Sequence, residues 1–331
     1  MAGDTSTPSR FLQGQATGST LSDMRTLALD IFGGEVITAF DLATITVDKV
    51  QTRTLSGGMR SARFPKIWKA TAEYHTAGAE LLGNEIETGE ITITPDELLV
   101  AHTAIYDLDE MLSHFDVRSQ FSIELGRALA RVYDQNNFRQ IIKTARMSDD
   151  GPFPGGTVLT DGSLVNSGAI DGVDWIDAIR SANKALFEND VPESQPRFMA
   201  VNWDVFDAIK YAKDENGHFL VLNRDIIGAQ SSGIAGRDET LNIDGVTIYK
   251  SRNLPKTNES ANNTVYSKYR ADYSNTTGIL WTPMAVANVK MRSITLETTR
   301  DVRRQENFMV ASMLAGHGSL RPECAVEFKK A

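Results

Sequence analysis

The sequence predicts an α+β fold for this chain of 331 residues, and three observations support that class. Apolar and polar residues alternate with period two in parts of residues 44–103, which is typical of strands. Residues 116–146 keep one apolar face at helical spacing, which predicts a long helix. Short alternating segments return after Pro283 and predict a strand-rich end of the chain.

Residues 1–43 predict an arm that carries two short helices. The first 20 residues are polar and rich in Gly, Ser and Thr, so we expect a mobile extension that orders on a partner. Apolar residues keep helical spacing over 21–31, Gly33-Gly34 interrupts the pattern, and a second short helix follows. Two such helices cannot bury their own apolar stripes and need another surface.

Residues 44–103 predict strands on either side of a long loop. Ile45 and Val47 alternate with polar neighbours, and so do Ile91 and Ile93. The polar segment between these strands is too long for an ordinary hairpin loop. We therefore expect this region to extend away from the body and pack elsewhere.

Charge is sorted by sign within this part of the chain. Residues 49–69 hold six Lys and Arg and no acid, whereas residues 70–110 hold ten Asp and Glu and no Lys or Arg. Two interpretations stay open on the residues alone. The two runs are either solvated faces of one hairpin, or a basic strand that meets an acidic strand of a neighbouring copy.

The helix predicted over 116–146 would be a rod of about 46 Å at about 1.5 Å per residue. Asp116 is a suitable N-cap, and Asp149-Asp150-Gly151-Pro152 stops the pattern. A helix of this length needs a broad surface to lie on, which indicates a structural spine.

Residues 151–282 predict a compact unit of helices and strands. Helical spacing covers 175–186 and 205–212, with strand-like segments at 198–201, 246–249 and 278–281. In the C-terminal region, residues 310–314 and 325–328 flank Gly316-His317-Gly318. The glycines predict positive φ and a tight turn, so we expect a closing hairpin there.

The composition excludes several classes of protein. The formal net charge is −9, whereas a protein that grips DNA backbone leans basic. A single cysteine, Cys324, allows no disulfide framework and no cysteine-based zinc site within one chain. We find no signal peptide and no apolar stretch of about 20 residues, so we expect a soluble protein of a reducing compartment that contacts no membrane.

Catalytic motifs are missing from the sequence. It contains no phosphate loop, dinucleotide fingerprint, nucleophile elbow or H-E-x-x-H pair. The strongest metal-ligand candidates precede or flank the long helix, where the acids also complement its dipole: His102, Asp107, Asp109, Glu110 and His114.

Three further residue types have plainer structural interpretations. His317, with Ser319 and Cys324 nearby, has no acid placed to orient it, so a turn is favoured over catalysis. Cys324 is expected to be a small buried residue. The four tryptophans are expected to be packing anchors and not a base-stacking platform: Trp68, Trp175, Trp203 and Trp281. We therefore predict no enzyme activity, no cofactor and no metal.

Several separated motifs resemble one protein family. Their order and spacing are similar to those of the major capsid proteins of short-tailed, T-seven-like (autographivirus) phages, closely over about 20–146 and 283–328 and more loosely between. The motifs are Ile31–Val36 (IFGGEV), Ile105–Asp107 (IYD), His114–Ser119 (HFDVRS) and Gly316–Glu323 (GHGSLRPE). The N-terminal arm departs most from the family, so its contacts are not carried over.

The resemblance implies the Hong Kong 97-type capsid fold. It also implies a division of the chain into an N-terminal arm (1–43), an extended loop that reaches a neighbouring subunit (44–103), a peripheral domain (104–150 and 283–331) with its spine helix at 116–146, and an axial domain (151–282). A lysine–asparagine cross-link occurs in some relatives of this fold, and we expect none here.

The resemblance implies a major capsid protein whose copies form hexamers and pentamers of an icosahedral virion shell around double-stranded DNA. Expected partners are other copies of the chain, a scaffolding protein, a portal, weakly held DNA and optionally a decoration protein, with assembly in the host cytoplasm. The rival functions are a cellular nanocompartment (encapsulin-like) shell and a soluble metal-dependent enzyme. For electrostatic contacts between subunits we predict Arg53, Arg63, Lys66, Lys69, Glu80, Glu85 and Glu87.

Overall fold

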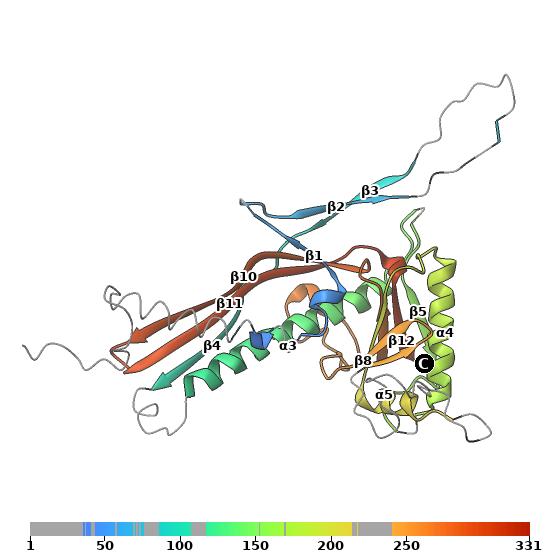
Figure 1. The fold of residues 1–331 in the computed structure, drawn as a ribbon. Coiled ribbons are helices and arrows are strands. Elements are labelled where there is room, and N and C mark those ends of the chain that lie inside the picture. Colours follow the sequence, from blue (N-terminus) through green and yellow to red (C-terminus); the bar gives the residue numbers. More distant parts are fainter. Residues whose placement is uncertain are drawn as a thin grey trace, which may run out of the picture.

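The fold is an elongated body from which one hairpin projects (Figure 1). The computed structural model describes residues 36, 38–40, 44–56, 58–68, 70, 72, 74–75, 86–106, 117–151, 153–168, 170–213, 217 and 240–331. Within these residues the strands form sheets of four, six and two strands. Residues 36 and 38–40 are helical, as predicted for the second short helix, whereas the helix predicted over 21–31 lies outside the described residues.

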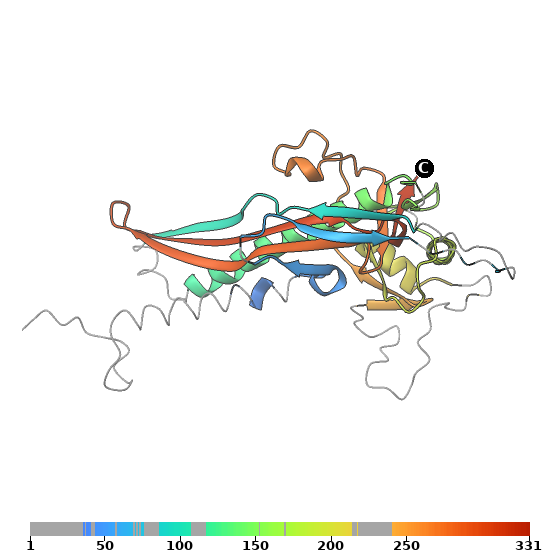
Figure 2. The same cartoon turned by 90° about the horizontal axis from the view of Figure 1, so that it is seen from above.

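The four-stranded sheet has the order β1-β10-β11-β4. Its two long strands run antiparallel as a ribbon along one side of the body (Figures 1 and 2), which confirms the strands predicted after Pro283. The shorter β1 pairs in parallel with β10, and β4 pairs antiparallel with β11. The bounds are β1 Gln51–Thr54, β4 Leu99–Tyr106, β10 Val286–Asp301 and β11 Glu306–Ser319.

The turn predicted at Gly316–Gly318 is wrong. These residues lie inside β11 and pair with the start of β10, so that His317 stands opposite Asn288. The predicted closing hairpin is wrong as well, because the last strand, β12 (Ala325–Lys330), joins a different sheet between β5 and β9. Neither glycine has a positive φ, so turn geometry is not the reason for them.

Helix α3 (Val117–Ala145) agrees to within one residue at each end with the spine predicted at 116–146. Its 29 residues span about 44 Å at about 1.5 Å per residue. The helix lies along the four-stranded sheet and continues to the six-stranded sheet (Figure 1). Its first half packs in one core with Met309 and Met313, and its last turns pack in the other with Trp281.

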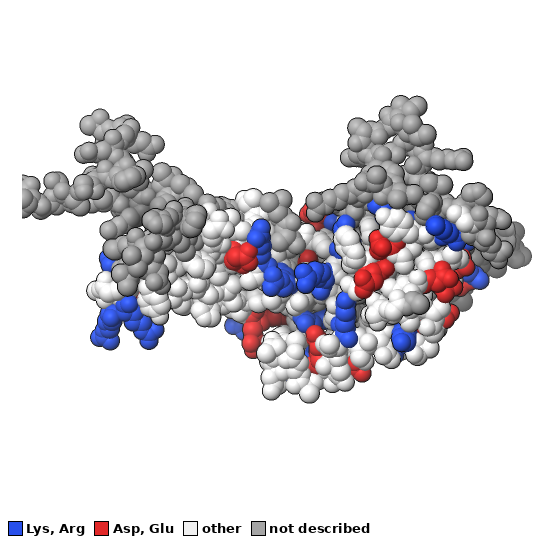
Figure 3. Space-filling model, turned by 90° about the horizontal axis from the view of Figure 1, so that it is seen from below, with Lys and Arg blue, Asp and Glu red and all other residues white. Residues whose placement is uncertain are grey.

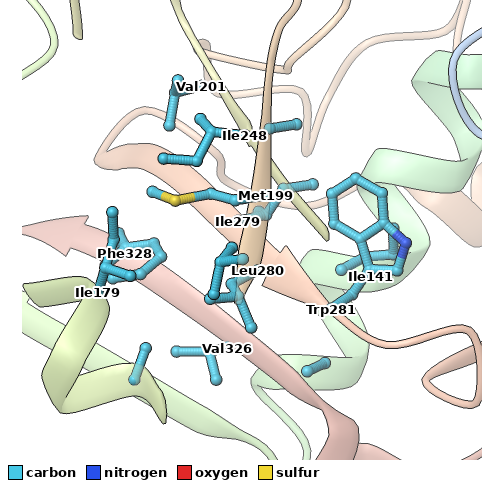
Figure 4. Packing of buried hydrophobic residues seen from close by; sticks show 14 of the residues in the cluster. Ile141, Ile179, Met199, Val201, Ile248, Ile279, Leu280, Trp281, Val326 and Phe328 are labelled. Atoms are coloured by element: carbon cyan, nitrogen blue, oxygen red, sulfur yellow. The ribbon is translucent and has the colours of Figure 1, made fainter. Parts of the chain in front are cut away.

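The six-stranded sheet has the order β5-β12-β9-β6-β8-β7 and carries the largest core. Trp175 and Trp281 are fully buried within this core, whose packing around Leu280, Ile248 and Phe328 is seen in Figure 4. The helices and central strands predicted for 151–282 are confirmed. Their bounds are β5 Thr157–Asp161, α4 Gly172–Glu188, β6 Arg197–Val201, α5 Trp203–Lys210, β7 Thr240–Ile243, β8 Val246–Lys250 and β9 Thr276–Trp281.

Two local predictions are wrong. Ile45 and Val47 do not lie on a strand, and residues Val47–Lys49 form a 3-10 helix. The buried carboxylate of Asp134 on α3 accepts the backbone N–H of Ile45 (2.9 Å) and of Thr46 (3.1 Å), which draws the chain out of an extended path. Trp203 is not a packing anchor, because it begins α5 with 58% of its surface exposed.

The two-stranded sheet is the projecting hairpin of β2 (Ala62–Ile67) and β3 (Thr88–Ile93). It confirms the strand predicted at Ile91 and Ile93. Most of the polar segment that joins the two strands lies outside the described residues.

Candidate assembly interface

The base of the hairpin is fixed to the body by a small core. Alternate residues of β2 are buried, as expected for a strand with one covered face. Side chains from the hairpin, the start of β10 and the residues just after β1 and β11 form this core: Leu55, Ala62, Phe64, Ile93, Ala287, Val289 and Leu320. The other face of β2 is open, and Ile67 on it is 60% exposed. The hairpin therefore presents one free face beyond a fixed base.

Two glycines of β11 allow the chain that leaves the hairpin to cross the strand closely. A Cβ on Gly316 would lie 2.3 Å from the carbonyl oxygen of Thr94. A Cβ on Gly318 would lie 2.7 Å from Cδ1 of Ile93. Side chains alternate between the faces of a strand, so both glycines face the hairpin. They are small because the crossing leaves no room for a side chain.

The alternate residues of the same segment face α3. His317 is buried and donates a hydrogen bond through Nδ1 to Oδ1 of Asn288 (2.7 Å). Its ring packs edge-on against Tyr133 of α3 at 4.8 Å between ring centroids. Ser319 Oγ accepts hydrogen bonds from Gln140 (2.7 Å) and Thr144 (2.8 Å) of the same helix. The motif Gly-His-Gly-Ser thus joins the hairpin base to the spine helix.

A partly buried group of polar side chains holds the chain just beyond the hairpin. The carboxylate of Asp96 receives a hydrogen bond from the Tyr269 hydroxyl and an ion pair from Lys268 Nζ at 3.0 Å. The Tyr269 hydroxyl also accepts the backbone N–H of His317 at 3.3 Å. Burial, and then the negative charge of Asp96, raise the pKa of Tyr269, so the phenol stays protonated and donates. We call Asp96, Lys268, Tyr269, Gly316, His317 and Gly318 the hairpin anchor.

His317 is a neutral core residue in this setting. Burial, with the positive charges of Lys268 and Lys290, lowers its pKa from the ordinary 6.5 to about 3. The imidazole contacts Asn288 and aromatic rings, and no acidic side chain is hydrogen-bonded to it among the described contacts. A catalytic role therefore finds no geometric support.

Acidification is expected to destabilise the subunit through His317. Between pH 6.5 and about 3 the unfolded chain binds a proton at this residue and the folded chain does not. The free energy of unfolding therefore falls with falling pH, by about 1.4 kcal/mol per unit or about 2 kcal/mol at pH 5. Urea unfolding of the unassembled subunit at pH 7 and pH 5 measures this loss. His317→Asn is the comparison, because it keeps a polar partner for Asn288 without titrating, and an equal pH dependence in the two proteins would contradict the assignment.

The predicted contact residues differ in their exposure and in the groups that they contact. Arg63 and Glu90 form an exposed ion pair across the two strands of the hairpin, 3.2 Å apart. Arg53 donates to the backbone carbonyl of Arg63 at 3.1 Å. Lys66 is buried, with Nζ 3.8 Å from the ring centroid of Phe153.

Of the four remaining candidates, Glu87 alone belongs to the described residues. Glu87 is exposed, and its carbonyl accepts the backbone N–H of Trp68. The other three candidates, Lys69, Glu80 and Glu85, lie outside the described residues. Arg53, Arg63 and Glu87 are thus the described candidates that offer exposed charge, whereas Lys66 is buried and supports the fold of its own chain.

Most of the metal-ligand candidates lie outside the described residues. His102 is exposed on β4 and lies against the ring of Phe308. The other four, Asp107, Asp109, Glu110 and His114, lie outside the described residues. In the part of the chain that is described, no group of three or more His, Cys, Asp or Glu is placed to hold a metal ion. No described helix is both long and apolar enough to span a bilayer.

Sequence reasoning missed most of the hairpin anchor. Asp96 stands in an acidic run, and Tyr269 follows a polar loop, so neither has a local signal. The one available signal is the spacing of Gly316 and Gly318 around a histidine, with alternating residues on either side. In a strand, this spacing puts two vacant positions on one face.

A long spine helix along two sheets, with a locked and projecting hairpin, defines the subunit of a Hong Kong 97-type capsid shell. The capsid protein of cyanophage P-SCSP1u has this fold, with a TM-score of 0.72, 35% identity, and coverage of 87% of this chain and 88% of that one. Residues 63–329 match the family model Gp10A-like, described as major capsid protein. The chain belongs to this family of major capsid proteins.

Curated relatives agree with this assignment. The major capsid protein of Escherichia phage T7 is 30% identical over 328 residues, covering 92% of this chain and 91% of the relative. That of Enterobacteria phage T3 is 28% identical over 334 residues, covering 94% and 93%. These matches are to tailed-phage capsid proteins, so the nanocompartment alternative is not favoured.

Proposed function

We propose that copies of this chain form the hexamers and pentamers of an icosahedral shell around a double-stranded DNA genome. In this assignment 1–43 is the arm, 44–103 the extended loop, 104–150 with 283–331 the peripheral domain, and 151–282 the axial domain. The observation that carries the proposal is the hairpin of β2 and β3, which has an anchored base and an open outer face. A strand pair with one open face is suited to pack on another subunit.

The proposed interface uses the charge of the hairpin. Arg63 has 73% of its side chain exposed while paired with Glu90, so its guanidinium has donors left for a second acid. We assign contacts between copies to the exposed Arg53, Arg63 and Glu87. We extend the assignment to Lys69, Glu80 and Glu85 by their place in the sorted charge runs. Each contact is modest, and repetition around closed rings makes the shell stable.

The further partners follow from the proposed role as a shell. They are a scaffolding protein during assembly in the host cytoplasm, a portal at one vertex and optionally a decoration protein. DNA contact is proposed to be weak and non-specific, with no enzymatic activity. The net charge of −9 supports weak contact, and on the face seen in Figure 3 Lys and Arg are interspersed with Asp and Glu.

Reversing the charge of Arg63 is expected to weaken assembly without unfolding the subunit. An exposed contact is worth about 0.5–1 kcal/mol, so Arg63→Glu is expected to raise the subunit concentration needed for shell formation about 2- to 5-fold at low salt. Sedimentation of shells from free subunits, at several salt concentrations, measures this change. The effect is expected to shrink as salt rises.

The double variant Arg63→Glu with Glu90→Lys separates the two interpretations of the charge pattern. It restores the ion pair within the hairpin and leaves the charge offered to a neighbour inverted. We expect the double variant to assemble as poorly as Arg63→Glu. Assembly equal to that of the unchanged protein would mean that the charges serve only the hairpin itself and would overturn the proposed contact.

A further inference from the structure

A small cavity with a mixed polar and apolar lining lies where the hairpin meets the body. Its volume is about 160 Å³, and its walls come from the hairpin end, the segment after α4 and the 3-10 helix Pro322–Cys324. Among the lining residues are Trp68, Asn189, Arg321 and Glu323. The hairpin wall includes Ile67, which is 60% exposed, so the cavity adjoins the outer surface of the subunit.

One carboxylate oxygen of Glu323 is buried without a hydrogen-bond donor among the described residues. The residue is 5% exposed, and the oxygen without a donor is Oε2. The three other buried glutamates of the described chain each face an arginine: Glu259 with Arg139 (2.8 Å), Glu306 with Arg304 (3.6 Å) and Glu327 with Arg146 (2.6 Å). Glu323 departs from this pattern, although Arg321 lines the same cavity.

The surroundings of Glu323 favour a positive charge. Helix α4 ends at Glu188, and its C-cap Asn189 lines the cavity. The C-terminal end of a helix carries partial negative charge and attracts cations. A buried carboxylate is costly unless it is paired, so a cavity that combines these two features is completed by a cationic group.

We propose that Glu323 receives the ammonium or guanidinium group of a basic side chain from a second copy of this chain when subunits assemble. The cavity has room for the end of one such side chain and adjoins the face that carries the hairpin. This inference rests on the assembly of copies into a shell and not on the charge contacts proposed for Arg63. The carboxylate is thus unpaired in the free subunit and paired in the shell.

Glu323→Gln tests the proposal, with Glu327→Gln as the matched control. Both variants neutralise a buried glutamate, but Glu327 already pairs with Arg146 inside the subunit. We expect Glu323→Gln to leave the thermal unfolding temperature of the free subunit unchanged or higher, and to raise the concentration needed for shell formation about 10-fold or more. Glu327→Gln is expected to lower the unfolding temperature of the free subunit.

Three outcomes would overturn the proposal. If Glu323→Gln destabilises the free subunit, Glu323 has a partner within its own chain. If Arg321→Met then impairs shell formation to the same extent, that partner is Arg321. Unchanged assembly of Glu323→Gln would show that no cation enters. If putrescine raises the unfolding temperature of the unchanged subunit but not that of Glu323→Gln, the cavity binds a free ammonium compound and not a side chain of a second copy. If Arg63→Glu assembles normally while Glu323→Gln does not, the hairpin contact fails and this inference stands.

Discussion

Gly316→Ala is expected to prevent the hairpin from seating on the body and to abolish normal shell formation. The new Cβ would lie 2.3 Å from the Thr94 carbonyl oxygen and 2.8 Å from Cα of Pro95, both backbone atoms. These backbone atoms cannot give way as the end of a flexible side chain can, so either β11 or the hairpin base must shift. Overpacking of this kind costs about 1–3 kcal/mol or more. Thermal unfolding, limited proteolysis of the hairpin and electron microscopy of shells measure the result.

Gly162→Ala is the control for this substitution. A Cβ on Gly162 meets nothing within 4 Å, and its φ is not positive, so it changes the same residue type without a clash. We expect the control to unfold and assemble like the unchanged protein, and Gly316→Ala to expose the hairpin to protease. Identical cleavage and assembly in the two variants would contradict a close crossing at Gly316.

The long helix and the helices of the middle region could be predicted because their signal is local. Apolar residues at helical spacing are visible along α3 and α4 without knowledge of what they pack against. The strands β6, β8 and β9 were equally readable from short apolar runs. Which strands share a sheet could not be predicted, because strands distant in the sequence pair with each other. For example, β12 pairs with β5, about 170 residues earlier in the chain.

The errors occur where a distant residue decides local structure. Thr46 leaves the extended path because Asp134, 88 residues away, captures its backbone and side chain. Gly316 resembles a turn residue until the crossing of Thr94 is known. Sequence gives the identity of these residues but not the partner, and the partner sets the conformation.

Only part of the candidate interface could be predicted, because the sequence shows which residues are charged but not which of them the fold buries. Sorted charge is visible in the sequence, and it identified Arg63, which the structure places exposed on the hairpin. It also included Lys66, whose ammonium lies over Phe153, because a buried and an exposed lysine have the same sequence signal. The unpaired state of Glu323 is likewise a property of the folded surroundings.

Arg146→Met is expected to lower the free energy of unfolding of the subunit by about 3–5 kcal/mol. Arg146 follows the last turn of α3 and donates through Nε and Nη2 to both oxygens of Glu327 on β12, each at 2.6 Å. Glu327 is fully buried, and Thr276 is its other hydrogen-bond partner. Methionine fills much of the same space but leaves the carboxylate without its counter-charge. Urea unfolding of the free subunit measures the loss.

The double variant Arg146→Met with Glu327→Gln shows whether the loss comes from the stranded charge or from packing. Removing the carboxylate as well is expected to recover part of the stability, since a neutral amide is less costly to bury than an unpaired charge. Arg180→Met is the control, because Arg180 pairs with Asp177 on an exposed face and should change stability by less than about 1 kcal/mol. A double variant no more stable than Arg146→Met would assign the loss to the contacts of Arg146 with Asp272 and Thr276 instead. Either result tells how firmly the end of the spine helix is tied to the six-stranded sheet, and every copy in a shell repeats that connection.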